Sequence, residues 1–416
     1  MTPPHKGQRS KSHWHAVTAG FLGWTLDAFD FFVVVFLVDT LALRFGVAKA
    51  AIIATIGATL IMRPVGALLF GLLADRFGRR APLMGNVILY SLLALLCGFS
   101  TNYVMFLILR SLFGIAMGGE WGVGASLAME AAPPRWRGVL SGILQSGYSI
   151  GYLLAALAVR VILPNLPAAS GWRWMFWIGG LPALLALYIR MHVPESAAWE
   201  QHRQPSFVAV LHTAARHWKL FAYLCLMMTL FMFLSHGTQD LYPDFLKGEF
   251  HVSTTRAADI AILYNIGAVI GAIIFGQLSE GFGRRYSIAS ALSLSLAVVP
   301  LWAFGDTLLK VTLGAFLMQV GVQGAWGIVP AHLNEVSPDG ARGLVPGLAY
   351  QMGILFAAGT STIEYALRSR IGYRWALASF ELTTIILLGI VVLLGREQKG
   401  KSFLRAPADE LVVPTS

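Results

Sequence analysis

Residues 71–80 read Gly-Leu-Leu-Ala-Asp-Arg-Phe-Gly-Arg-Arg, and the pattern returns at residues 276–285 as Gly-Gln-Leu-Ser-Glu-Gly-Phe-Gly-Arg-Arg. The same offset of 205 residues relates further identical pairs, namely Trp121 and Trp326, Gly122 and Gly327, Glu130 and Glu335, Pro133 and Pro338, Arg137 and Arg342, Gly138 and Gly343, and Gly142 and Gly347. A repeat of about 200 residues is too long for one unit of a solenoid. The offset therefore predicts two homologous halves packed side by side.

The composition places both halves in a membrane. The chain is 56% hydrophobic and 12% charged, with a mean hydropathy of +0.66. Crossing about 30 Å of hydrocarbon takes a helix of about 20 apolar residues. Twelve such stretches, six per repeat, run over 15–43, 51–73, 82–100, 103–129, 139–163, 172–192, 219–246, 257–278, 286–305, 309–332, 343–367 and 374–395. We expect an all-α protein of two six-helix bundles.

The distribution of Lys and Arg sets the expected orientation, because loops rich in these residues stay in the cytoplasm. Alternate loops and both tails collect most of them: Lys6, Arg9, Lys11, Arg76, Arg79, Arg80, Arg135, Arg137, Arg190, Arg203, Arg216, Lys219, Arg284, Arg285, Arg342, Arg396, Lys399, Lys401 and Arg405. Both termini are thus expected in the cytoplasm, and the net charge of +10 is a topology signal that calls for no nucleic-acid partner.

The expected organisation is a tail at 1–14, a first bundle at 15–192, a linker at 193–218, a second bundle at 219–395 and a solvated tail at 396–416. The first apolar stretch is too long for a removed signal peptide and contains two aspartates, so it counts as a span. Compact loops and the lack of a targeting segment favour a bacterial inner membrane. We expect a monomer.

Two features that suggest other chemistry fail in context. Cys97 and Cys225 lie inside spans without the spacing of a disulfide framework or a metal site. Residues 395–402, Gly-Arg-Glu-Gln-Lys-Gly-Lys-Ser, fit the phosphate-binding pattern G-x-x-x-x-G-K-[ST], which needs a strand before it and a helix after it. A membrane span precedes this stretch, so we expect a basic flank, with no cofactor, no metal and no enzyme activity.

The repeated loop after the second and eighth spans resembles that of the major facilitator superfamily of secondary transporters. The resemblance covers nearly the whole chain and implies two bundles that rock around a site near the bilayer midplane. It also implies a cytoplasmic gate, with Glu130 near Arg137 and Glu335 near Arg342, built from Asp75, Arg79, Glu130, Arg137, Glu280, Arg284, Glu335 and Arg342. For Arg80 and Arg285, a role as positive charges that keep these loops in the cytoplasm is an equally good explanation.

Ionisable residues inside spans are the candidate site, because each costs about 2.5 to 3.5 kcal/mol at a helix centre. Arg63 lies halfway along the second span, where a planar guanidinium fork suits a carboxylate. A structural ion pair with Asp27 or Asp30 is the alternative. These aspartates share one helical face and repel unless partnered, so either is a candidate proton carrier. Arg110 resembles the fourth-span arginine that the superfamily associates with proton coupling.

The seventh span carries a second polar stretch, Ser-His-Gly-Thr-Gln-Asp at residues 235–240, followed by Pro243. His236 and Asp240 are one turn apart, and Pro243 with Gly237 loosens the helix. The stretch resembles the signature of the sialate/proton symporter and yeast-type lactate permease group, roughly N-x-x-[ST]-H-x-[ST]-Q-D-x-x-x-T. That resemblance implies substrate contacts from Arg63, His236, Gln239, Asp240 and Gln351, with Asp240 also a candidate for proton coupling. Met232, Asp244 and Ile354 depart from the group's pattern.

Together these features predict proton-coupled symport of a small monocarboxylate anion such as lactate or pyruvate. Uptake of one proton with one monoanion moves no net charge, so the pH gradient would drive it; each uncompensated charge would be worth about 2.3 kcal/mol per 100 mV. Sialic acid is the alternative substrate. A sugar/proton porter of the same fold would not need Arg63, and a sensor or membrane enzyme would need features that the sequence does not display.

Overall fold

The computed structural model describes residues 6–167, 170–204 and 206–404, and this part of the chain contains helices and no strand. The first half comprises α1 (Lys6–Phe36), α2 (Val38–Phe45), α3 (Lys49–Phe77), α4 (Arg80–Cys97), α5 (Tyr103–Ala131), α6 (Arg137–Leu157), α7 (Gly171–Ile178) and α8 (Ala183–His192). Short turns η1 (Pro134–Trp136), η2 (Ala158–Ile162) and η3 (Leu163–Asn165) flank α6. The outermost tail residues, 1–5 and 405–416, lie outside the described part.

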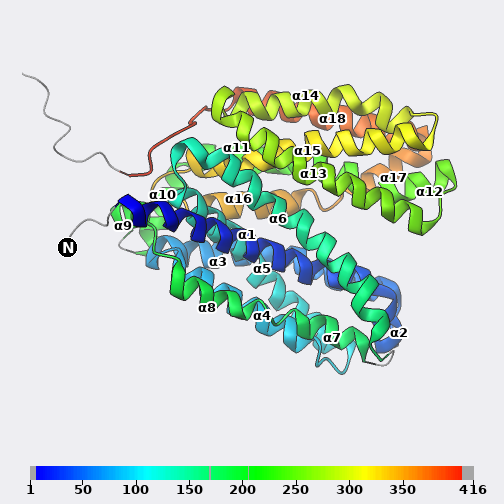
Figure 1. Cartoon of the computed structure of the whole chain (residues 1–416), viewed down its shortest axis with the longest axis horizontal. Coiled ribbons are helices and arrows are strands. Elements are labelled where there is room, and N and C mark those ends of the chain that lie inside the picture. Colours follow the sequence, from blue (N-terminus) through cyan, green and yellow to red (C-terminus); the bar gives the residue numbers. More distant parts are fainter. Residues whose placement is uncertain (1–5, 168–169, 205, 405–416) are drawn as a thin grey trace, which may run out of the picture.

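The second half comprises α11 (Trp218–Gln239), α12 (Tyr242–Phe250), α13 (Thr254–Phe282), α14 (Arg284–Phe304), α15 (Leu308–Val336), α16 (Val345–Phe356), α17 (Thr360–Ile371) and α18 (Tyr373–Leu394). Figure 1 shows the two halves side by side, the blue-to-green helices on one side and the yellow-to-red helices on the other. The expected pair of six-span bundles is confirmed.

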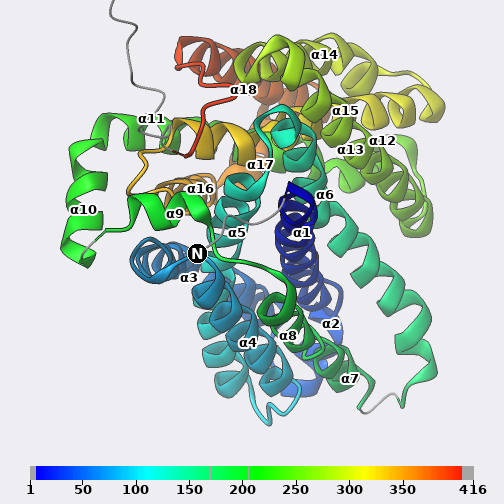
Figure 2. The same cartoon turned by 60° about the vertical axis from the view of Figure 1, so that its left-hand side comes forward.

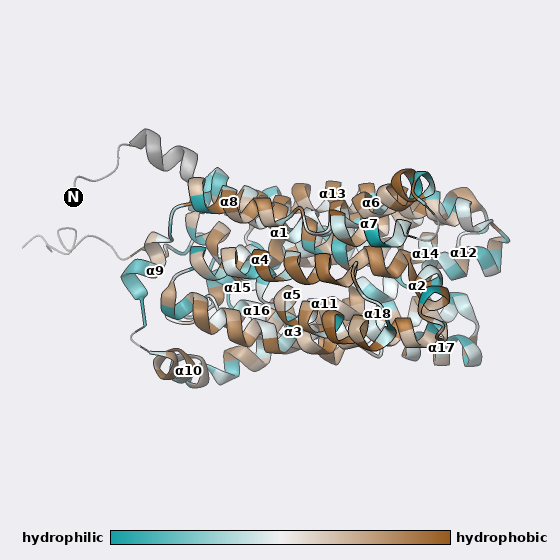
Figure 3. Cartoon of the chain, turned by 90° about the horizontal axis from the view of Figure 1, so that it is seen from below, coloured by the Kyte–Doolittle hydropathy of each residue, from teal (hydrophilic) through white to brown (hydrophobic). Residues whose placement is uncertain are grey.

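Eleven helical stretches of the described chain are long and apolar enough to cross a membrane. Figure 3 shows hydrophobic residues along the length of the bundle and more hydrophilic ones at its ends. The twelfth crossing is the expected span at 343–367, which the structure divides into α16 and α17. The break falls at 357–359, and the Thr360 hydroxyl donates to the Ala357 carbonyl at 2.6 Å. This chain is a multi-pass membrane protein.

The bundle has two distinct ends. The basic end carries the repeated loops before α4 and α14, together with the linker helices α9 (Ala197–His202) and α10 (Phe207–Arg216); Figure 2 shows α10 between α3 and α11 and α9 next to α3. Trp199 of α9 donates its indole N–H to the Asp75 carbonyl at 2.9 Å and so holds the linker against the first half. The far end carries the loops before α3, α5, α13, α15 and α18.

The repeated loops turn on two glycines with positive φ, Gly78 at +105° and Gly283 at +92°. L side chains rarely adopt this conformation, which explains the glycine of each repeat. A Cβ atom would also meet a carboxylate at each glycine, Glu195 at the first and Glu397 at the second. Glu195 accepts from the Arg79 N–H at 2.8 Å, and Glu397 accepts from the Arg285 N–H at 3.0 Å. Each glutamate thereby satisfies free N–H groups at the start of the next helix.

Candidate functional site between the halves

At the basic end, an acidic side chain of each half binds the start of a helix in the other half. Asp75 of α3 accepts from the N–H groups of Gly343 at 2.8 Å and Leu344 at 2.9 Å, where α16 begins. Glu280 of α13 accepts from the N–H of Gly138 at the start of α6. Free N–H groups and the helix dipole favour a carboxylate in both places. The repeat thus produces two equivalent contacts that join the halves.

The arginine and glutamate residues that the sequence predicts as a gate pair across the halves. Arg137 of the first half lies 3.0 Å from Glu335 of the second, and Arg342 of the second lies 3.4 Å from Glu130 of the first. The expected pairs were Glu130 with Arg137 and Glu335 with Arg342, each within one half. In the structure each arginine instead pairs with the glutamate of the opposite half. All four side chains are buried, and removing one partner from such a pair is strongly destabilising.

Within each half, a further arginine completes this network. Arg79 binds Asp75 at 2.7 Å and Glu130 at 3.0 Å, and Arg284 binds Glu335 at 2.9 Å. Close backbone packing accompanies these contacts, because a Cβ atom on Gly122 would lie 2.6 Å from the Cα of Gly347. The structure is therefore closed at its basic end.

Midway along the first half, three buried carboxyl groups lie around two buried guanidinium groups. Arg63 of α3 acts electrostatically on Asp27 of α1 and on Glu120 of α5, and Arg110 of α5 acts on Asp27 and Asp30. Nε and Nη2 of Arg63 and both carboxylate oxygens of Asp27 have no hydrogen-bond partner among the described residues. The structure brings these charges together without tying them into fixed pairs.

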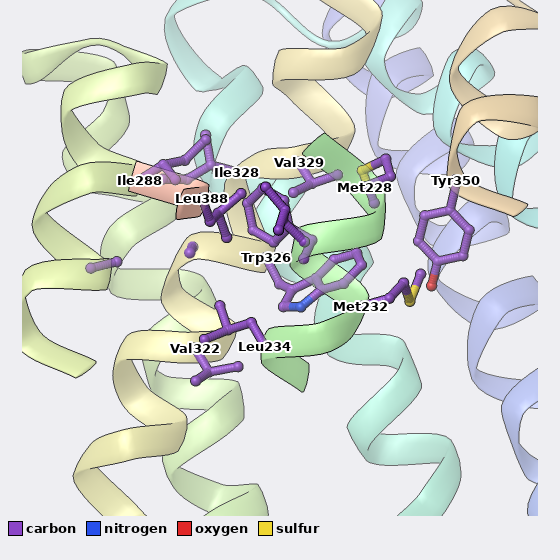
Figure 4. Close-up of a cluster of buried hydrophobic side chains, with 14 of the residues drawn as sticks. Met228, Met232, Leu234, Ile288, Val322, Trp326, Ile328, Val329, Tyr350 and Leu388 are labelled. Atoms are coloured by element: carbon purple, nitrogen blue, oxygen red, sulfur yellow. The ribbon is translucent and has the colours of Figure 1, made fainter. Parts of the chain in front are cut away.

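Aromatic side chains lie next to Arg63. Its guanidinium carbon is 5.9 Å from the ring centre of Trp24, which stacks on Tyr148 at 5.5 Å. Tyr350 of α16 stacks on Trp121 at 4.2 Å and lies 5.7 Å from Trp326, so these rings span the two halves. Figure 4 shows Tyr350 near Met232 and Trp326. Gln351, beside Tyr350, donates to the Gly118 carbonyl of the first half at 3.2 Å.

The polar stretch of α11 lies across the interface from Arg63. His236 and Asp240 approach to 3.1 Å, as their spacing predicts, and the Ser361 hydroxyl donates to Asp240 at 3.3 Å. His236 feels the charge of Arg63, and Asp240 acts on Tyr148, so both residues face the first half. Their side chains are nevertheless 37% and 39% exposed. Both side chains therefore keep accessible surface, whereas the interface is closed at the basic end.

Gln239 takes part in a different contact. Its amide donates to Gln319 of α15 at 2.8 Å, and Gln319 donates to the Thr238 hydroxyl at 3.1 Å. The helix ends at Gln239 and resumes at Tyr242, with Pro243 in the first turn of α12. The break agrees with the loosening expected from Gly237 and Pro243.

The sequence interpretation missed three buried acids. Glu120 packs against Gly23 of α1, and Glu381 of α18 packs against Gly237 of α11. Glu364 of α17 feels the charge of Asp240. The carboxylate oxygens of all three have no hydrogen-bond partner in the described chain. The signal was present, because each lies within one of the expected spans, where an ionisable group needs a reason.

The fold has twelve spans in two repeated halves, is closed at its basic end and holds charged residues midway along the spans. This is the fold of a membrane transporter. The chain belongs to the sugar (and other) transporter family, whose model matches residues 12–206 and 221–397. It superimposes with a TM-score of 0.79 and 19% identity on a structure of XylE, a proton:xylose symporter of the major facilitator superfamily, over 95% of this chain and 98% of that one. The proteins of this superfamily are transporters and not enzymes.

Two relatives by sequence are organic acid transporters by name. The chain is 31% identical over 392 residues to a carboxylic acid transporter protein homolog of Saccharomyces cerevisiae, covering 88% of this chain but only 63% of the yeast protein. It is 27% identical over 399 residues to the sialic acid transporter NanX of Escherichia coli, covering 93% and 95% of the two chains. The expected superfamily is confirmed.

Proposed function

We propose that this protein carries a small monocarboxylate together with a proton by alternating access, with lactate- or pyruvate-like anions as the leading substrates. The observation that carries the proposal is Arg63, a buried guanidinium whose Nε and Nη2 have no partner among the described residues. A guanidinium offers a carboxylate two parallel hydrogen bonds. His236 and Asp240 face it from the other half, and both side chains keep accessible surface.

The coupling we propose follows from the charges around Arg63. Asp27 and Glu120 compete with an incoming carboxylate for the same guanidinium. A proton on either acid removes one competitor and leaves Arg63 free to bind the substrate anion. Asp30 and Arg110 complete this group, and Asp240, beside the substrate, is the corresponding proton acceptor in the second half. Proton and anion would then bind together and move no net charge.

The names of the relatives support an organic acid and leave its identity open. The carboxylic acid transporter homolog favours a carboxylate, and NanX favours sialic acid, which is our second candidate. His236, Gln239, Asp240 and Gln351 would contact the substrate in either case. A sugar/proton porter is the weaker alternative, because a neutral sugar gives Arg63 no anionic partner.

The remaining assignments are also proposals. The positions of Lys and Arg put the basic end and both termini in the cytoplasm, and we place the protein in an inner membrane as a monomer. Asp75, Arg79, Glu130 and Arg137, with Glu280, Arg284, Glu335 and Arg342 of the second half, would then form a cytoplasmic gate. In this interpretation the closed basic end corresponds to an outward-facing state.

Uptake into liposomes tests the proposal. Purified protein is reconstituted, an inward proton gradient is imposed, and uptake of labelled lactate, pyruvate, sialic acid and xylose is measured for the parent, Arg63→Ala, Arg63→Lys and Arg256→Ala. Arg256 is an exposed arginine at the far end and serves as the matched control. We expect gradient-dependent lactate or pyruvate uptake in the parent and Arg256→Ala, none in Arg63→Ala, and weak uptake in Arg63→Lys, which keeps the charge without the fork.

Two results would change the assignment. Uptake of sialic acid alone selects the second candidate, and uptake of xylose that survives Arg63→Ala selects the sugar porter. Uptake of none of the four by folded protein rejects these substrates.

A further inference from the structure

The last described segment of the chain, Arg396–Leu404, crosses the basic end and touches both halves. The sequence suggests a solvated tail here, yet the Phe403 side chain is only 4% exposed. The segment includes residues 396–402 of the stretch that imitates a phosphate-binding loop, and Glu397, Lys399 and Lys401 bind the protein itself. We call this segment the strap.

The strap is anchored to the second half along most of its length. Lys399 donates to the carbonyl oxygens of Glu280 at 3.1 Å and Gly281 at 2.9 Å. The N–H of Gly400 lies 3.3 Å from the Glu335 carboxylate, and Lys401 lies 3.2 Å from Asp339. The strap therefore belongs structurally to the second half.

Its contact with the first half is made through Arg137. This arginine donates to the Lys401 carbonyl at 3.0 Å, and its guanidinium carbon lies 3.9 Å from the ring centre of Phe403. Arg342 of the second half lies over the same ring at 4.1 Å. Phe403 is thus held by two guanidinium groups from opposite halves.

We propose that the strap is a latch that stabilises the closed basic end through Phe403. A phenylalanine ring attracts cations through its π face, and this attraction grows when the groups are desolvated, as they are here. When the basic end opens, Arg137 moves away from Arg342, and Phe403 can stay with only one of them. Opening therefore costs the strap its contacts with the first half. The latch acts on the closed state whatever substrate the protein carries.

Distances between spin labels test the latch without any substrate. Labels are placed at Phe77→Cys and Phe282→Cys, two exposed positions that the repeat makes equivalent, in a background without Cys97 and Cys225. Phe403→Leu removes the aromatic face and keeps an apolar side chain, Phe403→Trp keeps a face, and Leu404→Ala changes the exposed neighbour as a control. Thermal unfolding verifies that each variant is folded.

We expect Phe403→Leu to increase the ratio of open to closed basic ends at least about fivefold, because the closed end holds one more such contact than the open end. Phe403→Trp and Leu404→Ala should keep the parent's distance distribution. If Phe403→Leu and Leu404→Ala give the same distribution as the parent, the latch is refuted. Because the measurement needs neither substrate nor proton gradient, its outcome is independent of the transport assay.

Discussion

At the residue scale, glycines set how closely α3 and α5 approach. A Cβ atom on Gly118 would overlap the carbonyl oxygen of Arg63, and one on Gly114 would overlap that of Thr59. Small residues at such spacing let membrane helices pack backbone to backbone. The consequence for function is that Arg63 is fixed by its main chain, so its side chain meets Asp27 and Glu120 from a defined position.

Gly118→Ala should therefore destabilise the first half. Overpacking of a tight contact costs about 1–3 kcal/mol, and the added methyl group would push Arg63 away from α5. Gly85→Ala in α4 is the matched control, because a Cβ atom there meets nothing within 4 Å and alanine favours a helix by about 0.5–1 kcal/mol. Thermal unfolding in detergent should give a lower midpoint for Gly118→Ala and an equal or higher one for Gly85→Ala. Equal loss in both would contradict this account.

Glu120 allows the proposed coupling to be tested apart from folding. Glu120→Gln keeps the shape of the side chain and removes its ability to carry a proton, so accumulation driven by a pH gradient should fall well below the parent's. Exchange of labelled for unlabelled substrate at equal pH, which needs no net proton movement, should persist. Asp259→Asn, on an exposed part of α13, controls for loss of an acid as such. Full accumulation in Glu120→Gln would remove Glu120 from the coupling group.

The sequence indicated Arg63, Asp27, Asp30 and Arg110 because charge inside an apolar stretch is rare and expensive. The same rule applies to Glu120, so its omission was avoidable. The sequence did not predict which side chains surround Arg63. Spacing along one helix predicts the contact of His236 with Asp240, whereas the approach of α1, α3 and α5 at one depth depends on packing that a single sequence does not reveal.

At the element scale, the two broken spans differ in how far they could be foreseen. Pro243 lacks an N–H, so a break near Gln239 follows from local chemistry. The break between α16 and α17 was not predicted, because no proline marks it and its residues are apolar apart from Gly359. The tail offers a similar contrast. The charges of the tail predicted that it is exposed to solvent. Phe403 is buried because it packs against Arg137 and Arg342, whose positions the sequence does not reveal.

Asp339, in the loop between α15 and α16, should make the stability of the fold depend on pH. Burial would raise the pKa of Asp339, but Arg342 and Lys401 outweigh it and lower the pKa below its usual value of 3.8. A carboxyl group with a lowered folded-state pKa stabilises the fold above its unfolded-state value and loses that contribution as the pH falls through the folded-state value. Between pH 5 and 7, the midpoint temperature of unfolding of Asp339→Asn should lie below that of the parent by a constant amount.

Below pH 3.8 the difference between parent and Asp339→Asn should begin to shrink, and it should reach zero only once the pH is below the lowered folded-state pKa, where Asp339 is neutral like asparagine. Thermal unfolding from pH 7 to pH 3 measures this. Asp306→Asn serves as a comparison, because Asp306 also pairs with a lysine, Lys310, but lies in an exposed loop at the far end. A difference that stays constant down to pH 3 would mean that the charge of Asp339 contributes nothing.

At the scale of the whole molecule, the repeat predicted two halves but not how they contact one another. Asp75 and Glu280 each bind a helix start in the opposite half, and Arg137 and Arg342 each pair with a glutamate of the opposite half. Sequence proximity had suggested pairs within each half. The approximate twofold relation explains why the crossed contacts come in twos, since a contact from the first half to the second has its equivalent in the reverse direction.

This crossed arrangement predicts reciprocal motion of the two ends. Two rigid halves that rock around the level of Arg63 cannot open both ends at once. One pair of labels at Phe77→Cys and Phe282→Cys reports the basic end, and another at Leu43→Cys and Leu309→Cys, both highly exposed, reports the far end. Arg137→Glu, which places a negative charge against Glu335, should lengthen the first distance and shorten the second. A pair inside the first half, Leu43→Cys with Val104→Cys, should keep its distance; if that distance changes as much as the others, the halves are not rigid and the rocking description fails.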